Sequence, residues 1–442
     1  FMPNSIIIKK KIKKFNKVIS VTGDKSISIR WVLFSSLGQG VSRAKNLLIS
    51  EDVLAAIKAV KKLGIKVKLQ KKNECKIFGK GINGYVYKKN LTIDAQNSGT
   101  LGRLILGLLV DTPNKIRLVG DKSLSKRDFK RVADPLKKFG AKFQLTNKKC
   151  LPLTINGSSR LKPIKYSEIL GSAQCKSAVI FAGMRTKGTT IIKAKKSRNH
   201  TELLCKHLSL PVTVKKYKNY EIIKVKKVKK IKKLNYIIPS DISSSAFFIA
   251  LTILSENSKL IIKNVNINSS RVGIISILKM MGAKIELKNK KIYKGEKNAD
   301  IKIESTKKIK AINCPVGLNS SAIDEFLVIF LVAAKAKGVS LFKDLSELNQ
   351  KESPRLKWGA KILNMMGINT ILTKSSIKIY GNPNLILKKK IIIRSFLKDH
   401  RIFMTSVVAA LSFGGSWEIH DKDSINSSFP DFLNILGKLN KR

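Results

Sequence analysis

Histidine and cysteine, the residues from which most metal and disulfide sites are built, are scarce in this sequence. Its 442 residues include 4 histidines and 5 cysteines. The cysteines form no C-x-x-C pair, and an odd number does not fit a disulfide framework or a structural zinc site. No two histidines have the spacing of metal ligands on one helix. We therefore expect no bound metal, no cofactor and a reducing, cytoplasmic environment.

Long hydrophobic runs are also missing. The longest candidate, residues 326–334, is bounded by Glu325 and Lys335 and is far shorter than the roughly 20 apolar residues that cross a bilayer. Near the N-terminus the apolar residues 6–8 are followed at once by lysines, which is unlike the apolar core of a signal peptide. These patterns predict a soluble protein that does not associate with a membrane.

Acidic residues are few relative to basic ones. With 28 Asp and Glu against 88 Lys and Arg, the formal net charge is +60. Such a charge is compatible with nucleic acid, an anionic membrane surface or small anionic substrates as partners. The most basic run, residues 224–233, has only valine and isoleucine between its lysines, whereas an RNA-binding platform needs aromatic side chains. We therefore favour lysines on solvated faces and keep a basic RNA-binding protein as an alternative.

A repeated pattern of helix, turn and strand runs through the chain. Clear copies have a glycine after the helix at positions 64, 140, 282 and 367, and weaker copies lie at Leu208-Ser209 and Leu436-Gly437. A glycine just after the last helical residue readily takes the positive φ of a helix C-terminus. Six units of about 70 residues therefore predict two α/β domains of three units each.

A second, more apolar helix is expected in each unit, and its start is rich in small polar and charged residues. The six starts lie at residues 24–28, 97–100, 171–174, 241–244, 320–324 and 399–401. Helix N-termini present free N–H groups and the positive end of the helix dipole, so these starts favour anions. We expect one domain over residues 22–240 and a discontinuous second domain of residues 1–21 and 241–442, to which a strand over residues 6–18 returns.

Nine short segments occur in the order found in one enzyme family. They are GDKSISIR (23–30), NSGTLGR (97–103), GDKSLSKR (120–127), SAQCK (172–176), SRNHTE (197–202), IDE (323–325), KESPR (351–355), DHR (399–401) and SSFP (427–430). Together they resemble the EPSP synthase family, and SAQCK and SRNHTE resemble its class II. The resemblance covers essentially the whole chain. It implies the enolpyruvyl transferase fold: two inside-out α/β domains, each of three βαβαββ-type units, joined by two crossovers.

The resemblance also implies an activity and a set of site residues. EPSP synthases transfer the enolpyruvyl group of phosphoenolpyruvate to the 5-hydroxyl of shikimate 3-phosphate and release phosphate, on the route to chorismate and the aromatic amino acids. Carried over by motif, the catalytic residues are Asp324, Glu352, Lys25 and Lys351. The shikimate 3-phosphate site comprises Lys25, Ser26, Arg30, Ser172, Ala173, Gln174, Arg198, Asp324 and Lys351. The phosphoenolpyruvate site comprises Lys25, Asn97, Gly99, Arg127, Gln174, Arg355 and Arg401.

These residue types suit the chemistry that the resemblance implies. Each substrate carries a carboxylate and a phosphate, so several cations are needed to neutralise them. The planar guanidinium groups of Arg355 and Arg401 can hold a carboxylate in a two-pronged contact. Addition of a hydroxyl to a carbon–carbon double bond needs a base and an acid, for which the resemblance assigns Asp324 and Glu352.

Three positions depart from patterns of the family. Asp128 follows Arg127 where proline is usual, and its carboxylate is a candidate to weaken the hold of Arg127 on an anion. Pro354 stands where aspartate is usual, and Ser427 stands where class I members carry a phosphate-binding lysine. Glyphosate competes with phosphoenolpyruvate in this family. The class II resemblance and Ser427 favour tolerance of it, whereas Gly99 keeps a small residue that leaves room for the inhibitor, so intermediate tolerance is expected.

The nearest alternative is the enolpyruvyl transferase that acts on UDP-N-acetylglucosamine. It shares the fold and the donor but lacks the KSxSxR and KES segments as they occur here. For either activity we expect small anionic substrates as partners. We also expect a monomer without a specific nucleic-acid partner.

Overall fold

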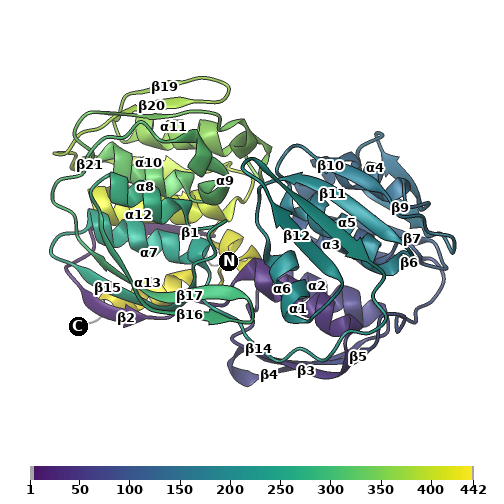
Figure 1. The fold of residues 1–442 in the computed structure, drawn as a ribbon. Coiled ribbons are helices and arrows are strands. Elements are labelled where there is room, and N and C mark those ends of the chain that lie inside the picture. Colours follow the sequence, from purple (N-terminus) through teal and green to yellow (C-terminus); the bar gives the residue numbers. More distant parts are fainter. Residues whose placement is uncertain (1–3, 441–442) are drawn as a thin grey trace. The chain divides into compact units, whose positions relative to one another are not determined.

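The computed structural model describes residues 4–440 as two compact units (Figure 1). The N-terminal unit comprises Gly23–Ile238 and Lys294–Glu296, and the C-terminal unit comprises the described residues of Phe1–Thr22, Pro239–Tyr293 and Lys297–Arg442. Helices recur between groups of strands along the chain, which makes this an α/β protein. No helix among residues 4–440 is both long and apolar enough to cross a membrane.

The N-terminal unit contains three four-stranded sheets. Their strand orders are β14–β3–β5–β4, β6–β7–β9–β8 and β10–β11–β13–β12. In each sheet the first two strands are parallel and the remaining neighbours are antiparallel. The bounds are β3 (Gln39–Lys45), β4 (Lys66–Gln70), β5 (Glu74–Lys80), β6 (Leu91–Asp94), β7 (Ile116–Val119), β8 (Lys142–Thr146), β9 (Cys150–Asn156), β10 (Lys165–Glu168), β11 (Thr189–Lys195), β12 (Val212–Lys216), β13 (Tyr220–Lys226) and β14 (Tyr236–Ile237).

Two kinds of helix accompany these sheets. The helices α1 (Lys25–Leu37), α3 (Gly99–Leu108) and α5 (Ala173–Arg185) are buried over most of their length. The helices α2 (Glu51–Lys62), α4 (Lys130–Lys137) and α6 (His200–His207) each keep an exposed side. Apolar helices without a polar face need protein on every side, so the first three lie inside the unit.

The C-terminal unit contains one four-stranded and two three-stranded sheets. Their orders are β16–β17–β15–β2, β18–β20–β19 and β1–β22–β21. The bounds are β1 (Ser5–Ile8), β2 (Asn16–Ile19), β15 (Lys259–Asn266), β16 (Lys284–Tyr293), β17 (Glu296–Glu304), β18 (Val339–Phe342), β19 (Thr370–Leu372), β20 (Ile377–Tyr380), β21 (Leu387–Ile393) and β22 (Gly414–His420).

The N-terminal segment returns to this unit as expected, but as two strands. β1 pairs antiparallel with β22, and β2 pairs parallel with β15, where Val18 lies opposite Ile261. The expectation of one strand over residues 6–18 is therefore wrong. The lysine-rich residues 9–14 between the two strands pair with neither sheet. The apolar residues on either side of this stretch belong to β1 and β2, which lie in different sheets.

The helices α7 (Ile242–Leu254), α10 (Phe326–Ala334) and α12 (His400–Phe413) are buried at every position. Figure 1 shows them in the interior of the C-terminal unit, with β15 and β17 on one side and β19 and β20 on the opposite side. Other helices of this unit are α8 (Gly273–Met280), α9 (Asn319–Ala322), α11 (Arg355–Met365) and α13 (Phe432–Asn440). Each buried aliphatic or phenyl side chain contributes about 1.5–3 kcal/mol, so these helices hold the unit together.

The helix-ending glycines behave as expected in the four clear copies. Gly64, Gly140, Gly282 and Gly367 have φ values of 88°, 115°, 94° and 86°. The weaker copy at Gly437 is wrong as a helix end, because α13 continues through it to Asn440. A glycine tolerates helical φ as well as positive φ, so its presence alone does not end a helix.

Candidate active site

The start of α1 brings Lys25, Ser26 and Arg30 close together in the N-terminal unit. Asp24 caps this helix, because its Oδ1 accepts a backbone N–H of the first turn at 2.8 Å. Lys25 Nζ lies 3.0 Å from Asp52 Oδ2. A capped helix N-terminus with an ammonium group beside it favours an anionic ligand.

Arg30 is held inside the unit by three hydrogen bonds. Its side chain donates from Nε to Thr201 Oγ1 at 2.8 Å, from Nη1 to the Ser26 carbonyl at 3.1 Å and from Nη2 to Ser177 Oγ at 3.3 Å. Burial lowers the pKa of Arg30 to about 10, and repulsion from Arg198 acts in the same direction. Arg30 therefore stays cationic at neutral pH, near a second guanidinium group.

The start of α3 contributes Asn97 and Gly99. Ser98 caps the helix by accepting the N–H of Leu101 at 3.1 Å, so Gly99 is its first residue. Asn97 Oδ1 accepts a hydrogen bond from Arg127 Nη2 at 3.0 Å. The amide of Asn97 thus orients Arg127 beside the N-terminus of α3.

Asp128 does not compete for Arg127. Its Oδ1 accepts the backbone N–H groups of Lys130 at 2.8 Å and Arg131 at 3.3 Å. These bonds satisfy free N–H groups at the start of α4, as a capping carboxylate does. The replacement of proline therefore changes the local turn, and the carboxylate is occupied there.

Gln174 lies in the first turn of α5, after the capping residue Ser172 and after Ala173. Its Nε2 donates to Thr100 Oγ1 at 3.1 Å, and its Oε1 accepts from Arg103 Nη1 at 2.7 Å. These bonds tie the start of α5 to α3 and fix which end of the amide faces Arg103.

Sequence reasoning assigned no role to Arg103, although the residue ends the NSGTLGR segment. It also donates from Nη2 to the Asp128 carbonyl at 3.1 Å and lies over the Phe129 ring at 4.8 Å. Burial lowers the pKa of Arg103 to about 10. The available signal was an arginine placed within an otherwise apolar helix.

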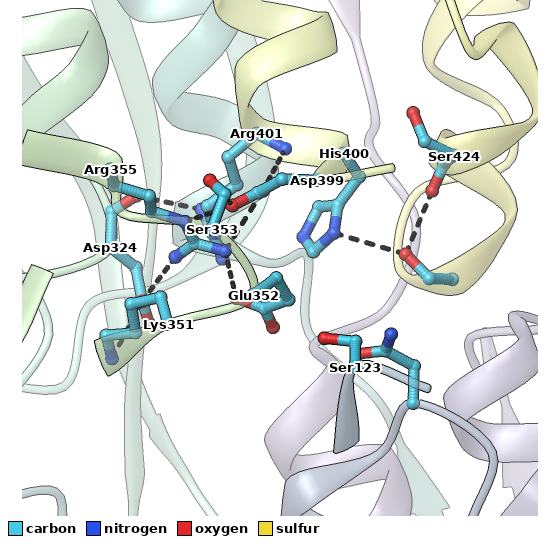
Figure 2. A network of polar contacts seen from close by, with 12 residues as sticks. Ser123, Asp324, Lys351, Glu352, Ser353, Arg355, Asp399, His400, Arg401 and Ser424 are labelled. Carbon is cyan, nitrogen blue, oxygen red and sulfur yellow. Dashed lines mark hydrogen bonds and ion pairs between the residues drawn. The ribbon is translucent and has the colours of Figure 1, made fainter. Parts of the chain in front are cut away.

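The carboxylates of the C-terminal unit gather around Arg355, the first residue of α11 (Figure 2). Arg355 contacts Asp399 through Nε–Oδ2 at 2.8 Å and Nη2–Oδ1 at 3.2 Å. The same guanidinium contacts Glu352 through Nη2 and lies 3.4 Å from Asp324 Oδ1 through Nη1. Three acidic side chains from separate segments therefore share one cation.

Asp324 has two further neighbours that the sequence had singled out. It lies in the break between α9 and α10, where residues 323–325 belong to neither helix. Lys351 Nζ lies 3.4 Å from its Oδ1, and Arg401 Nη1 donates to its backbone carbonyl at 2.9 Å. Asp324, Lys351, Glu352, Arg355 and Arg401 are thus brought together within this unit.

The electrostatics of this cluster are governed by the buried Arg355–Asp399 pair. Burial alone would raise the pKa of Asp399, but the charge of Arg355 outweighs it and holds that pKa below its ordinary value. Burial likewise opposes the charge of Arg355, yet Asp399 and Glu352 raise its pKa above its ordinary value. Both groups are therefore charged at neutral pH.

The other two departures from the family pattern, Pro354 and Ser427, are explained by their local contacts. Pro354 occupies the N-cap position of α11, where the missing N–H of proline removes no helix hydrogen bond. Ser427 Oγ is paired with His400 Nδ1 at 3.1 Å and donates to the Ser424 carbonyl at 2.9 Å. Ser427 therefore presents a hydroxyl group where a class I lysine would present a charge.

The fold of the chain is that of an enolpyruvyl transferase. It is similar to the enolpyruvyl transferase NikO from Streptomyces tendae with a TM-score of 0.76 and 14% identity, covering 98% of this chain and 97% of that one. The profile of the EPSP synthase (3-phosphoshikimate 1-carboxyvinyltransferase) family matches residues 9–436. The chain belongs to the EPSP synthase family.

Individual relatives agree over the full length. The chain is 40% identical over 423 residues to a 3-phosphoshikimate 1-carboxyvinyltransferase of Ruthia magnifica subsp. Calyptogena magnifica, covering 95% of this chain and 94% of the relative. It is 36% identical over 434 residues to that of Bacillus subtilis (strain 168), covering 98% and 99%. The EPSP synthase structure from Acinetobacter baumannii has a TM-score of 0.86 and 34% identity, covering 98% and 97%.

These comparisons confirm the α/β enolpyruvyl transferase fold and the family that the nine segments predicted. They do not favour the enzyme acting on UDP-N-acetylglucosamine. The roles of the individual site residues stay predictions. The contacts described above for each unit indicate which substitutions would test them.

Proposed function

We propose that the chain transfers the enolpyruvyl group of phosphoenolpyruvate to the 5-hydroxyl of shikimate 3-phosphate, with Asp324 and Glu352 as its acid–base residues. The observation that carries the proposal is the sharing of one buried guanidinium, Arg355, by these two carboxylates. In a chain of this family, two carboxylates held close together but by different nitrogens are suited to separate proton-transfer roles.

The N-terminal unit supplies cations for the anionic groups of the substrates. Shikimate 3-phosphate is bound by Lys25, Arg30 and Arg198. Phosphoenolpyruvate is bound by Lys25 and Arg127. Charge-assisted hydrogen bonds to phosphate and carboxylate are roughly twice as strong as neutral ones. Because the Arg30 and Arg198 charges repel each other, an anion that lies near both relieves this repulsion.

Ser26, Ser172, Ala173 and Gln174 complete the shikimate 3-phosphate contacts, and Asn97, Gly99 and Gln174 complete those of phosphoenolpyruvate. Arg355 and Arg401 hold the phosphoenolpyruvate carboxylate. The Arg355 side chain also engages Asp399 and Glu352, so its orientation is fixed before a substrate binds.

The chemical step is an addition followed by an elimination. In the addition, Asp324 accepts the proton of the 5-hydroxyl as its oxygen bonds to C2 of phosphoenolpyruvate, and protonated Glu352 gives a proton to the methylene carbon. In the elimination, the Glu352 carboxylate takes back a proton from the new methyl group while phosphate departs from C2 with the proton that Asp324 had accepted. This restores the double bond and the starting protonation of both residues. Lys351, beside Asp324 at 3.4 Å, stabilises the negative charge of these steps.

The test is release of inorganic phosphate by the purified chain. We expect release that requires both phosphoenolpyruvate and shikimate 3-phosphate and yields 5-enolpyruvylshikimate 3-phosphate. UDP-N-acetylglucosamine as the acceptor serves as the control. Release with that acceptor and none with shikimate 3-phosphate would overturn the proposal.

We also propose that the chain works as a monomer without a nucleic-acid partner. The basic run 224–233 is exposed at its lysines, while Val225, Val228 and Ile231 are buried beneath them. These lysines therefore form the solvated side of an ordinary packed segment. Light scattering tests the oligomeric state, and retention of labelled RNA at moderate salt would contradict the second part.

A further inference from the structure

One lysine of this lysine-rich chain lies in the protein interior. Among residues 4–440, Lys176 is the lysine whose side chain is fully buried, with 0% exposure. It lies in the second turn of α5, two residues after Gln174. A lysine is almost never fully buried unless it is paired, so its partners indicate its purpose.

Lys176 is paired with two buried carboxylates from different elements. Its Nζ lies 2.6 Å from Glu202 Oε1 on α6 and 2.9 Å from Glu221 Oε1 on β13. Burial would lower the pKa of Lys176, but Glu202 and Glu221 outweigh it and raise that pKa. The lysine is therefore charged and joins α5, α6 and β13 at one point.

Lys176, Glu202 and Glu221 together carry one excess negative charge, and Arg30 is a nearby cation. After burial, Glu202 is the strongest influence on the pKa of Arg30 and acts to raise it. Asp24, Arg198 and Glu296 act on the same guanidinium more weakly. The negative charge of Glu202 therefore favours the charged form of Arg30.

Adjacent residues of the same two helices bind Arg30 directly. Ser177 follows Lys176 on α5, and Thr201 precedes Glu202 on α6. Both hydroxyl groups accept hydrogen bonds from Arg30, and the two lie 2.7 Å from each other. The Lys176–Glu202 contact lies one residue away from the Ser177–Thr201 pair on each helix.

Stability alone does not account for such a cluster. The cost of removing several charges from water roughly cancels their attraction, so a buried ion pair adds little compared with apolar residues of the same size. What an ion pair adds is a defined geometry.

We propose that Lys176, Glu202 and Glu221 are positioning residues that fix Arg30, and with it the affinity for shikimate 3-phosphate. The inference rests on the role of Arg30 in the proposed function. It adds residues that contact no substrate but determine how one substrate binds. Because α6 begins two residues after Arg198, the same contacts also anchor the segment that carries this second cation.

The experiment compares Lys176→Met with a matched control on the same helix. Arg185, at the other end of α5, forms a largely buried ion pair with Asp111 at 2.6 Å. Both Lys176→Met and Arg185→Met should lower the thermal midpoint. Only Lys176→Met should raise the dissociation constant of shikimate 3-phosphate, by about tenfold or more, in calorimetric titration. The KM for phosphoenolpyruvate should change little.

Two milder variants keep the proposal testable if Lys176→Met does not fold. Glu202→Gln keeps the shape of the side chain, and Thr201→Val removes the hydroxyl that holds Arg30 Nε. Each should weaken shikimate 3-phosphate binding while leaving the phosphoenolpyruvate KM near that of the wild type.

The outcomes separate this inference from the proposed function. Unchanged shikimate 3-phosphate affinity in folded Lys176→Met, or in both milder variants, would overturn the positioning role while the wild type stays active. An equal loss of shikimate 3-phosphate affinity in Arg185→Met would also overturn the positioning role, because the effect would then follow from lowered stability alone. A wild type that neither binds nor turns over shikimate 3-phosphate would instead overturn the proposed function.

Discussion

The two units hold their site arginines in different ways. In the N-terminal unit Arg30, Arg103 and Arg127 are oriented by hydroxyl, amide and carbonyl groups. In the C-terminal unit Arg355 is surrounded by three carboxylates. Hydroxyl, amide and carbonyl groups orient a guanidinium without adding charge, whereas carboxylates offset part of its charge and are in turn oriented by it.

This difference indicates that the two units contribute differently to substrate binding and to proton transfer. Residues of the N-terminal unit are suited to binding phosphate groups. In the C-terminal unit Asp324 and Glu352 are suited to moving protons, beside the arginines proposed to hold the phosphoenolpyruvate carboxylate. Substitutions in the first set should change affinity more than turnover, and substitutions in the second should do the reverse. The following predictions test this contrast, beginning with the largest expected effect.

Glu352→Gln should nearly abolish turnover while leaving substrate binding intact. The amide keeps the shape of the side chain and can still accept a bond from Arg355, but it has no transferable proton. The turnover number should fall by about 10²- to 10⁴-fold. Steady-state rates and calorimetric titration with shikimate 3-phosphate measure the two quantities. Glu347→Gln, at an exposed position of the same unit, is the control, and near-normal turnover in Glu352→Gln would remove Glu352 from the acid role.

Asp399→Asn should destabilise the protein strongly, because it leaves Arg355 without its closest buried partner. The expected loss at pH 7 is about 3–5 kcal/mol in the free energy of unfolding, measured with urea. Asp423→Asn breaks a solvent-exposed pair with Lys398 and should cost no more than about 1 kcal/mol. Equal losses of unfolding free energy in the two variants would show that the buried Arg355–Asp399 pair contributes no more to stability than an exposed ion pair.

The same carboxylate gives a pH dependence of defined sign. Since the folded protein holds the pKa of Asp399 below its ordinary value of about 3.9, its contribution to stability is fully present above that pH. It is lost as the pH falls through the lowered pKa. The difference in unfolding free energy between wild type and Asp399→Asn should therefore be constant from pH 7 to about pH 5 and shrink in stronger acid. A difference that grows on acidification would contradict this.

Arg103→Met should weaken phosphoenolpyruvate binding by disorienting Gln174. Loss of the charged hydrogen bonds to Gln174 and the Asp128 carbonyl is expected to cost about 2 kcal/mol, seen as a rise in the phosphoenolpyruvate KM. Turnover at saturation should change much less, as for a binding residue. Arg117→Met, at an exposed position of β7, is the control. A loss of turnover with an unchanged KM would break the contrast between the units.

Gly99→Ala should give the smallest effect and increase tolerance of glyphosate. An added Cβ would lie 2.8 Å from Arg103 Nη1 and 3.3 Å from Arg127 Nη1. Both atoms are the ends of flexible side chains, so they can move. One added methyl group in a tight pocket changes ligand discrimination by about 1–3 kcal/mol, and we expect the effect on glyphosate binding to lie near the lower end of this range.

Competition between glyphosate and phosphoenolpyruvate measures this effect. The wild type should show intermediate tolerance. Gly317→Ala is the control, because its methyl group meets no atom within 4 Å. Inhibition of the wild type far below the phosphoenolpyruvate KM, or no gain from Gly99→Ala, would refute this interpretation of the pocket.

Much of the candidate site was readable from sequence because its residues stand at helix starts. Asp24, Ser98, Ser172 and Asp399 cap helices as their local patterns predict. Capping depends on contacts within three residues, so a short segment is enough to predict it. The nine ordered segments then predicted the family, which the comparisons confirm.

The errors arose where a local pattern permits two outcomes. Gly437 continues a helix, and residues 5–19 form two strands in two sheets. Arg103 was signalled only as an arginine within an otherwise apolar helix, and Lys176 gave no distinct signal, so the sequence did not indicate the partners of either residue. Their partners, Gln174 on one side and Glu202 and Glu221 on the other, lie 71, 26 and 45 residues away along the chain.

The sequence by itself determined the fold class, the helix starts and the family, because alternation of polar and apolar residues, helix capping and ordered motifs are local properties. Only the tertiary structure decided that Arg355 joins Asp324 and Asp399, and that Lys176 is buried between two carboxylates. The physical reason is that the partner of a buried charge is chosen by packing between distant segments, and no nearby residue in the sequence records that choice.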